Sequence, residues 1–442
     1  MRCFACKTFG KEVAEFDKIK KMKKINFLFL FLLLAGWASS AQIVRGPYLE
    51  DPTQTTLVMR WQTDTSTPAW LEYGPAPRCN QIMTLTPQGT QHKVVLYGLV
   101  PNQDFCYRVY VYNQAQDGVQ EPVAGTFRTL FSAERKIVKF VALGATASSA
   151  PQEPVSEDPQ ETSASFFPFM TAKPATPADD SAQARQNLAA RIAEEKSDFL
   201  IHTGNLTRSG LNADANAEFF TPFEQVLRNM PLFVAVGPNE YGPDRQSRDS
   251  KPFFLTNYRR FHDMSWSNAT PKYYSFDSAN ARFIFLDTNV AEGAVWAPDI
   301  TEKSAQVTWL KSTLAGAGEK WKIVVMNAPA YSSGVRGANN EVFLNLVKIF
   351  EEYRVNLVLQ GGDLNYERTF PMFRGEPKQN GVTYVTLGTA AATPTKRENP
   401  HPSTARFVSQ RHYAVVKIVD RRLSAKVYSD KGKLLDSFDL YL

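Results

Sequence analysis

The sequence is poor in the residues that most often bind metals or form catalytic thiols. Its 442 residues include five histidines and four cysteines, and two of the cysteines, Cys3 and Cys6, lie near the start of the chain. It has no Gly-x-Ser-x-Gly pattern and no glycine-rich phosphate loop. Those patterns mark the nucleophile turn of α/β-hydrolases and the nucleotide site of P-loop proteins. Their absence argues against both classes of enzyme.

An excess of charge is also lacking once the first residues are set aside. The formal net charge is +6, but residues 1–41 hold eight Lys and Arg against three Asp and Glu. The remainder holds 42 basic against 41 acidic residues, a net charge of +1. A nucleic-acid-binding protein of this size needs a basic surface that this composition does not supply. We therefore expect no nucleic-acid partner.

The apolar run at residues 27–35 follows four lysines and precedes several small residues. This order is typical of a secretory signal peptide, and the run is too short to favour a membrane-spanning helix. The lipid-accepting cysteine of a bacterial lipoprotein is missing, because the first residue after the expected cleavage site is Gln42. We expect a leader over residues 1–41, starting at Met1 or Met22, and an exported protein, periplasmic, cell-surface or secreted, with no membrane span after cleavage.

Cys79 and Cys106 are the cysteines that remain after the leader. An oxidising compartment permits a disulfide between them. The sequence alone does not show that their Cβ atoms meet, so it leaves open whether they pair.

Two patterns of secondary structure divide the rest of the chain. Residues 42–131 read as short alternating strands separated by turns, which favours a small β-sandwich with Trp61 in its core. A ligand-binding role for Trp61 or Trp70 is a weaker alternative. Residues 132–442 alternate strands with helices, which predicts an α/β layered domain with its loops gathered at one edge.

Residues 147–180 differ from their surroundings. They are rich in Pro, Ser, Thr and acidic residues, but they also contain the aromatic cluster at residues 166–170. A segment of this length within a domain is either a functional loop or a disordered insert. The aromatic cluster favours a loop that docks into a pocket or onto a partner, and disorder stays open as the alternative.

Residues 355–371 (VNLVLQGGDLNYERTFP) join an apolar strand to a polar loop. This stretch resembles the last motif of the calcineurin-like metallophosphoesterases, in their purple acid phosphatase-like branch. Residues 45–49 (RGPYL) and 99–109 are similar to the N-terminal fibronectin-III-like domain of that branch. The resemblance implies a four-layer α/β metallophosphoesterase-like sandwich over residues 132–442, preceded by an all-β fibronectin-III-like domain over residues 42–131.

Members of that family bind two metal ions through carboxylates, an amide and imidazoles on the loops that follow their strands, and the metals clamp a phosphate and activate water. Here the family's ligand positions hold other residues. In chain order these are Ala145 and Asn205 in place of two aspartates, Arg208 in place of a tyrosine, Pro238 and Asn239 in place of an amide ligand and a histidine, and Asn327, Gly362 and Leu364 in place of three histidines.

Two divalent cations at these positions would lack anionic partners, and desolvating them without such partners is prohibitive. We therefore expect no dinuclear metal site and no cofactor. The nearest carboxylates are Glu240, Asp287 and Asp363, which leave a single weakly bound cation as an alternative. We expect His202, at a strand end, to be a structural histidine.

The resemblance and the lost ligands together favour a catalytically inactive pseudophosphatase that serves as a binding or assembly module, with a protein partner, in the bacterial cell envelope. The amides of Asn205, Asn239 and Asn327 would suit a neutral polar ligand or a partner's loop better than a phosphate dianion. One alternative is a phosphoester hydrolase with a remodelled mono-metal or metal-free site. Another is a module in which the sandwich or residues 147–180 do the binding.

Overall fold

The computed structural model describes residues 41–80, 82–113, 118–119, 121–147, 180–208, 215–242, 245–247 and 273–442. The leader expected over residues 1–41 and the segment expected over residues 147–180 lie almost wholly outside these ranges. In the ranges that are described, no helix combines the length and the apolar content that a bilayer crossing requires.

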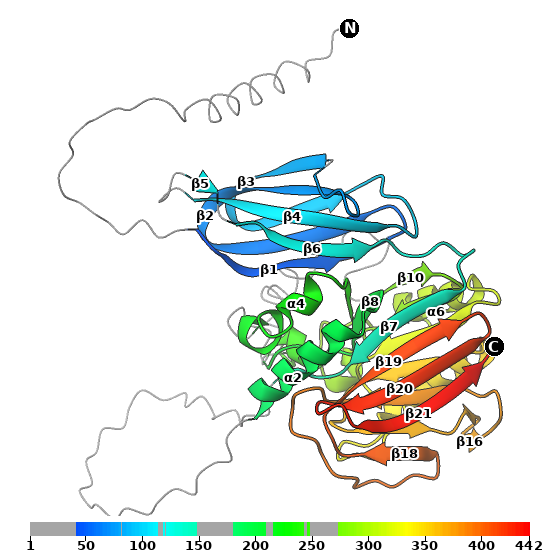
Figure 1. The fold of residues 1–442 in the computed structure, drawn as a ribbon. Coiled ribbons are helices and arrows are strands. Elements are labelled where there is room, and N and C mark those ends of the chain that lie inside the picture. Colours follow the sequence, from blue (N-terminus) through cyan, green and yellow to red (C-terminus); the bar gives the residue numbers. More distant parts are fainter. Residues whose placement is uncertain are drawn as a thin grey trace, which may run out of the picture. The chain divides into compact units, whose positions relative to one another are not determined.

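The N-terminal strands form an all-β region with its own hydrophobic core (Figure 1). The long strands β2 and β3 pair antiparallel, β1 lies beside the first part of β2, and β4 lies beside the second part. Trp61 is buried in this core, as expected, and stacks on His92 with ring centroids 5.2 Å apart. The strands are β1 Ile43–Glu50, β2 Leu57–Pro75, β3 Ile82–Leu96, β4 Asp104–Asn113, β5 Gly118–Val119 and β6 Val123–Arg128.

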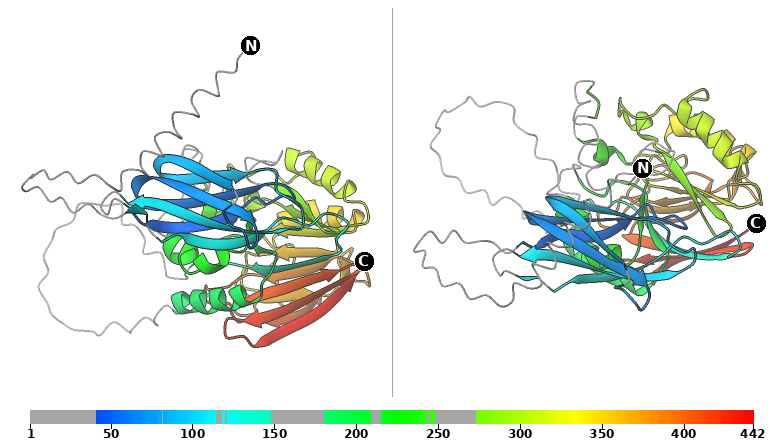
Figure 2. Two further views of the ribbon diagram at one scale, coloured as in Figure 1. Left: turned by 45° about the horizontal axis from the view of Figure 1, so that its top comes forward. Right: turned by 90° about the horizontal axis from the view of Figure 1, so that it is seen from above.

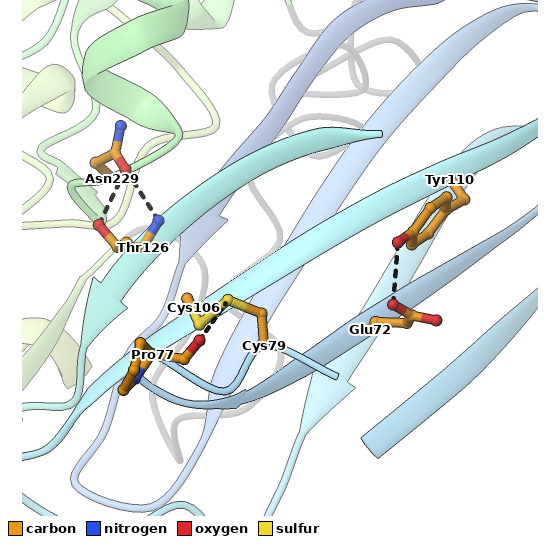
Figure 3. Close-up of a disulfide and its surroundings, with 7 residues drawn as sticks. All are labelled: Glu72, Pro77, Cys79, Cys106, Tyr110, Thr126 and Asn229. Atoms are coloured by element: carbon orange, nitrogen blue, oxygen red, sulfur yellow. Dashed lines mark hydrogen bonds between the residues drawn. A yellow bond between two sulfur atoms is a disulfide. The ribbon is translucent and has the colours of Figure 1, made fainter. Parts of the chain in front are cut away.

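Cys79 and Cys106 form a disulfide that joins the turn after β2 to strand β4 (Figure 3). Close to it, the backbone N–H of Thr126 on β6 donates to the Asn229 side chain at 2.9 Å. The Tyr107 hydroxyl donates to the carbonyl oxygen of Arg228 at 2.8 Å. The all-β region is therefore hydrogen-bonded to the part of the chain that follows it.

The rest of the described chain is built around two sheets. In the first, β7, β8 and β9 are parallel, and β19, β20 and β21 extend the sheet from β7. On its other side β9 pairs with β1 at one position, which makes this sheet continuous with the N-terminal strands. The strands are β7 Ile137–Leu143, β8 Phe199–His202, β9 Leu232–Val234, β19 His412–Val419, β20 Arg422–Ser429 and β21 Leu434–Tyr441.

The second sheet has seven strands in the order β10-β11-β12-β13-β17-β14-β18, and β11, β12, β13 and β17 are parallel. Its strands are β10 Tyr274–Ser278, β11 Ala281–Phe285, β12 Trp321–Met326, β13 Leu357–Gln360, β14 Tyr366–Thr369, β17 Thr383–Leu387 and β18 Thr404–Val408. A separate two-stranded sheet pairs β15 Met372–Phe373 with β16 Glu376–Pro377.

The two sheets pack face to face, and helices cover their outer faces. On β7, Phe140 and Ala142 point into the core between the sheets, whereas Val141 and Leu143 point toward the helices. This alternation is the period-two geometry of a strand buried on both faces. In Figures 1 and 2 the red strands β19–β21 lie against the yellow and orange strands of the second sheet. The result is the expected four-layer arrangement of helix, sheet, sheet and helix.

The helices differ from their predicted bounds where aromatic residues crowd the core. The sequence of residues 218–229 favours a single helix, whereas the structure divides this region into a π-helix, η2, and a short α-helix, α4. The wider π turn lets Phe219, Phe220 and Phe223 all reach the buried side. The helices are α2 Ser181–Glu194, η2 Asn216–Phe220, α4 Glu224–Leu227, η3 Pro238–Tyr241, η5 Asn289–Glu292, α6 Ala305–Ala315, α7 Asn340–Val342, η6 Phe343–Val347 and α8 Lys348–Glu352.

Candidate functional site

The loops that follow the parallel strands of both sheets meet at one edge. The backbone N–H of Ala145, after β7, donates to Gly388 O, after β17, at 3.2 Å. The Asn327 side chain, after β12, donates to Thr203 O, after β8, at 2.7 Å. Both bonds connect the first sheet to the second. The carboxyl ends of parallel strands are the usual place for a functional site, and most of the ligand positions inferred from the sequence lie on these loops.

Glycines allow these loops to lie backbone against backbone. A Cβ atom at Gly388 would lie 1.4 Å from Asp363 O, and one at Gly144 would lie 1.9 Å from Leu387 O. At Gly362, where the family has a histidine, φ is +83° and a Cβ would lie 2.6 Å from Pro329 Cδ. A side chain at position 362 would therefore meet both steric and backbone strain. The imidazole is absent, and the space for it is filled.

The three asparagines bind the backbone of the loops themselves. The Oδ1 atom of Asn205 accepts from the N–H of Asn239 at 3.1 Å, and Asn239 Nδ2 donates to Thr207 O at 2.9 Å. Asn327 is buried, and its Oδ1 has no hydrogen-bond partner among the residues that the structure describes. Each of the three amides thus has one polar atom engaged within the chain, and their binding of a neutral polar ligand stays a prediction.

Glu240 is the carboxylate at the centre of this edge. It is buried, and its Oε2 accepts from the N–H groups of Asn205 at 2.9 Å and Gly237 at 2.7 Å. Its Oε1 accepts from the N–H of Leu206 at 2.8 Å. Burial raises the pKa of Glu240 to about 7, while the three N–H donors oppose that shift. Glu240 therefore ties the loops after β8 and β9 together and has little capacity left for a metal.

The other two candidate carboxylates are likewise engaged. Asp363 is buried and accepts from the Ser332 hydroxyl at 2.6 Å and from the N–H groups of Arg336 and Gly337, each at 3.1 Å. Asp287 is buried and accepts from the Tyr241 hydroxyl and from Asn289. These bonds shape loops. Arg368 on β14 instead pairs with Asp436 on β21, at 2.7 Å, and so joins the two sheets.

The remaining positions supply no ligand group. Ala145 contributes only backbone atoms, Pro238 begins the short helix η3, and Leu364 is half-buried with its carbonyl oxygen bonded to Thr395 N. Arg208 lies at the end of the described loop, where its N–H donates to Glu218. Among the residues that the structure describes, no group of three or more His, Cys, Asp or Glu side chains could hold a metal ion. The residues present do not fit the dinuclear metal centre of the family.

His202 is a structural histidine, as the sequence indicated. Its Nδ1 accepts from Gly204 N at 3.1 Å, and its Nε2 lies 3.2 Å from the Thr146 hydroxyl. Burial lowers its pKa to about 3. His412 on β19 is also fully buried, and desolvation lowers its pKa to about 4 although Nδ1 lies 2.7 Å from Gln410 O. Both imidazoles are neutral in the folded protein near pH 7.

Because these two histidines are buried and neutral, we expect the free energy of unfolding to fall in acid. Because their folded pKa values lie below the ordinary 6.5, the unfolded chain binds more protons between about pH 3 and 6.5. Each of the two histidines should lower the free energy of unfolding by about 3–5 kcal/mol as the pH falls through that window. Urea unfolding at pH 7, 6, 5 and 4 measures this. His412→Asn should flatten the profile, and the matched change at exposed His401 should not; equal flattening by both would contradict the assignment.

The sequence indicated which residues stand at the family's ligand positions, but it did not show which contacts occupy the space around them. It treated Glu240 as a candidate ligand, whereas the structure uses it as an acceptor for three backbone donors. It did not single out Gly388 or Pro329, which close the space around residues 362 and 363. No local pattern marks these contacts, because they join residues from separate strands.

Comparisons with known proteins agree with this geometry. The family "Calcineurin-like phosphoesterase" matches residues 178–366. Mouse tartrate-resistant acid phosphatase type 5 is 26% identical over 50% of this chain and 67% of its own length. "Probable inactive purple acid phosphatase 27" of Arabidopsis thaliana is 24% identical over 55% of this chain and 43% of its own. The matches span 30% to 67% of the lengths of the curated relatives.

Among solved structures, purple acid phosphatase PPD1 from yellow lupin (Lupinus luteus) seeds has the same fold, with a TM-score of 0.69 and 16% identity. The similarity covers 90% of this chain and 74% of the lupin chain. Residues 178–366 therefore match the calcineurin-like phosphoesterases, and the chain is similar in sequence and fold to the purple acid phosphatases.

Proposed function

We propose that this protein is a catalytically inactive member of its family, exported to the bacterial cell envelope, where it acts as a binding or assembly module. The proposal rests on the side chains of the loops that follow the parallel strands. Amides or apolar residues stand at the ligand positions, and Glu240 and Asp363 are each engaged by three hydrogen-bond donors within the chain. A phosphoesterase of this family needs two metals held by anionic and imidazole ligands.

Metal content and turnover test the loss of chemistry. We expect protein purified without chelators or metal-affinity columns to contain near-zero iron, zinc and manganese by elemental analysis. We also expect no hydrolysis of an aryl phosphate above the buffer rate, with or without added Mn²⁺, Fe³⁺ or Zn²⁺. Stoichiometric metal, or a turnover that survives purification and disappears in a folded Asp363→Asn variant, would overturn the proposal in favour of a remodelled hydrolase.

We further assign residues 42–131 to a fibronectin-III-like domain and residues 132–442 to the phosphoesterase-like domain. The first assignment is supported by a hydrophobic core whose members, Trp61 among them, all lie between residues 41 and 127. Its test is expression of residues 42–131 alone, which should give a cooperatively unfolding all-β domain. An unfolded product would show that these strands depend on the pairing of β1 with β9.

The binding role is tested through the segment that the sequence singles out. Envelope proteins cross-linked to the intact protein in cells should be identified and compared with those captured by a variant lacking residues 148–179. Loss of one partner with the fold retained would place the binding in that segment. Retention of the same partner would direct attention to the strand-end loops around Asn205 and Asn239. Recovery of no specific partner from either form would contradict the module.

A further inference from the structure

Strand β3 is an edge strand that begins with exposed apolar residues. Within the described ranges of the chain, β3 pairs with β2 on one side and with no strand on the other. Ile82, Met83 and Leu85 are 48%, 53% and 51% exposed. Figure 1 shows β3 at the top of the all-β region, on the side away from α2 and α4. An exposed apolar strand edge is a template for pairing with another chain.

This stretch lacks the charges that usually keep sheet edges apart. Residues 82–92 contain no Asp, Glu, Lys or Arg. By contrast β10, β18 and β21, which end the paths of their sheets, carry Asp277, Arg406 and Asp439. Pro87 has no N–H to donate to a neighbouring strand, so it limits a new ladder to residues 82–86. The edge is therefore protected at Pro87 and open before it.

Met83 and Leu85 project from the same face of the sheet, because side chains alternate along a strand. Leu85 lies opposite Trp70 on β2, and Trp70 stacks on Tyr110 of β4 with ring centroids 5.2 Å apart. Met83 lies opposite Glu72, which accepts from the Tyr110 hydroxyl at 3.0 Å (Figure 3). The alternate residues of β2 are buried in the core, so this face points outward.

An antiparallel pairing of β3 with the β3 strand of a second copy, centred on Thr84, satisfies all of these features. Positions equally far from the centre then oppose each other, so Met83 meets the second copy's Leu85, and Leu85 meets the second copy's Met83. Each Leu85 is followed across the sheet by its own Trp70, so two apolar rows lie side by side at the junction.

The absence of charge favours a second copy over a different protein as the occupant. Self-pairing of a charged stretch places like charges close together, which is destabilising, and residues 82–86 hold none. Charge is also what commonly selects a different partner and fixes its register, and this edge offers none for that purpose. A two-fold contact needs only a patch that is complementary to itself, as the Met83 and Leu85 pair is.

We propose that this protein forms a two-fold homodimer through residues 82–86 of β3. The dimer joins two all-β regions edge to edge and covers Met83 and Leu85 of both copies. The contact is small, so we expect a dissociation constant in about the micromolar range. The dimer requires neither the loss of the metal ligands nor the binding role proposed above, so each can be contradicted alone.

Sedimentation equilibrium of the purified protein tests the dimer at concentrations up to about 0.5 mM. We expect a reversible monomer–dimer equilibrium. Leu85→Lys should raise the dissociation constant about tenfold or more, because it brings an ammonium group against apolar side chains of the second copy. Val419→Lys is the matched control, because Val419 is 43% exposed on β19; it should leave the dissociation constant unchanged. Both variants should fold, since both side chains reach solvent in the single chain.

Cross-linking tests the register of the pairing. Thr84→Cys places two thiols at the two-fold axis, where a short bismaleimide should join the two copies. Thr90→Cys is the control on the same strand, because residue 90 lies roughly 40 Å from its counterpart in this pairing. A monomer at every concentration, or equal cross-linking of the two cysteine variants, would overturn the proposal. So would a Leu85→Lys variant that loses a cross-linked envelope protein instead of a dimer, which would assign the edge to a different partner.

Discussion

Glu240→Ala is expected to lower the free energy of unfolding by about 3–5 kcal/mol, because it leaves three buried N–H groups without an acceptor. Those donors belong to Asn205, Leu206 and Gly237, on the loops after β8 and β9. Each unsatisfied buried donor costs about 1–3 kcal/mol, less where water enters the vacated space. Urea unfolding at pH 7.5 measures the change.

A second variant separates the hydrogen bonds of Glu240 from its charge, and a change at another glutamate serves as the control. Glu240→Gln keeps one acceptor oxygen but turns an amide N–H₂ toward a backbone donor, so we expect an intermediate loss of stability. Glu376→Ala is the matched control, since Glu376 is exposed on β16, and it should change the free energy of unfolding by less than about 0.5 kcal/mol. If Glu240→Ala were as stable as Glu376→Ala, the loops would not depend on this carboxylate.

The pH dependence of Glu240 has the opposite sign to that of the histidines. Its folded pKa of about 7 lies above the ordinary 4.5. Its linkage contribution to stability is therefore fully present below about pH 4.5 and is lost as the pH rises through about 7. The wild type should lose more stability than Glu240→Gln as the pH rises from 5 to 8. Parallel profiles for the two proteins would show that the carboxyl is not titrating in this range.

Removing the disulfide is the second large effect that we expect. Cys79 and Cys106 are 27 residues apart in sequence, and closing a loop of this size restricts the unfolded chain by about 3–4 kcal/mol. The double change Cys79→Ala with Cys106→Ala should lower the free energy of unfolding by about that amount without reductant. Alanine is suited to position 106, because Cys106 is buried and alanine adds no polar group.

Reductant supplies the control for this second prediction. A thiol reductant should lower the stability of the wild type to that of the double variant and should leave the variant unchanged. The all-β region should be the part affected, because the disulfide joins the turn after β2 to β4 (Figure 3). If both proteins unfold at the same urea concentration without reductant, the two cysteines are not paired in solution.

The pattern of apolar and polar residues along the chain was sufficient to predict the layered fold. Short apolar runs such as residues 357–360 and 323–326 are buried on both faces, and such runs indicate parallel strands between layers. The motif at residues 355–371 then identified the family, and each lost ligand could be placed by its distance from a strand end. Helix bounds were less predictable around Phe219 and Phe223, because core packing selected a π turn there.

By itself, the sequence determined the layered α/β architecture, the resemblance to the calcineurin-like phosphoesterases and which residues stand at that family's ligand positions, because these depend on residue type and on short-range periodicity. Only the tertiary structure decided what the residues at the lost ligand positions do. Glu240 meets its three backbone donors, and Gly362 lies against Pro329, through contacts that are distant along the chain. Burial, hydrogen bonding and charge compensation depend on these long-range neighbours, which no local pattern encodes.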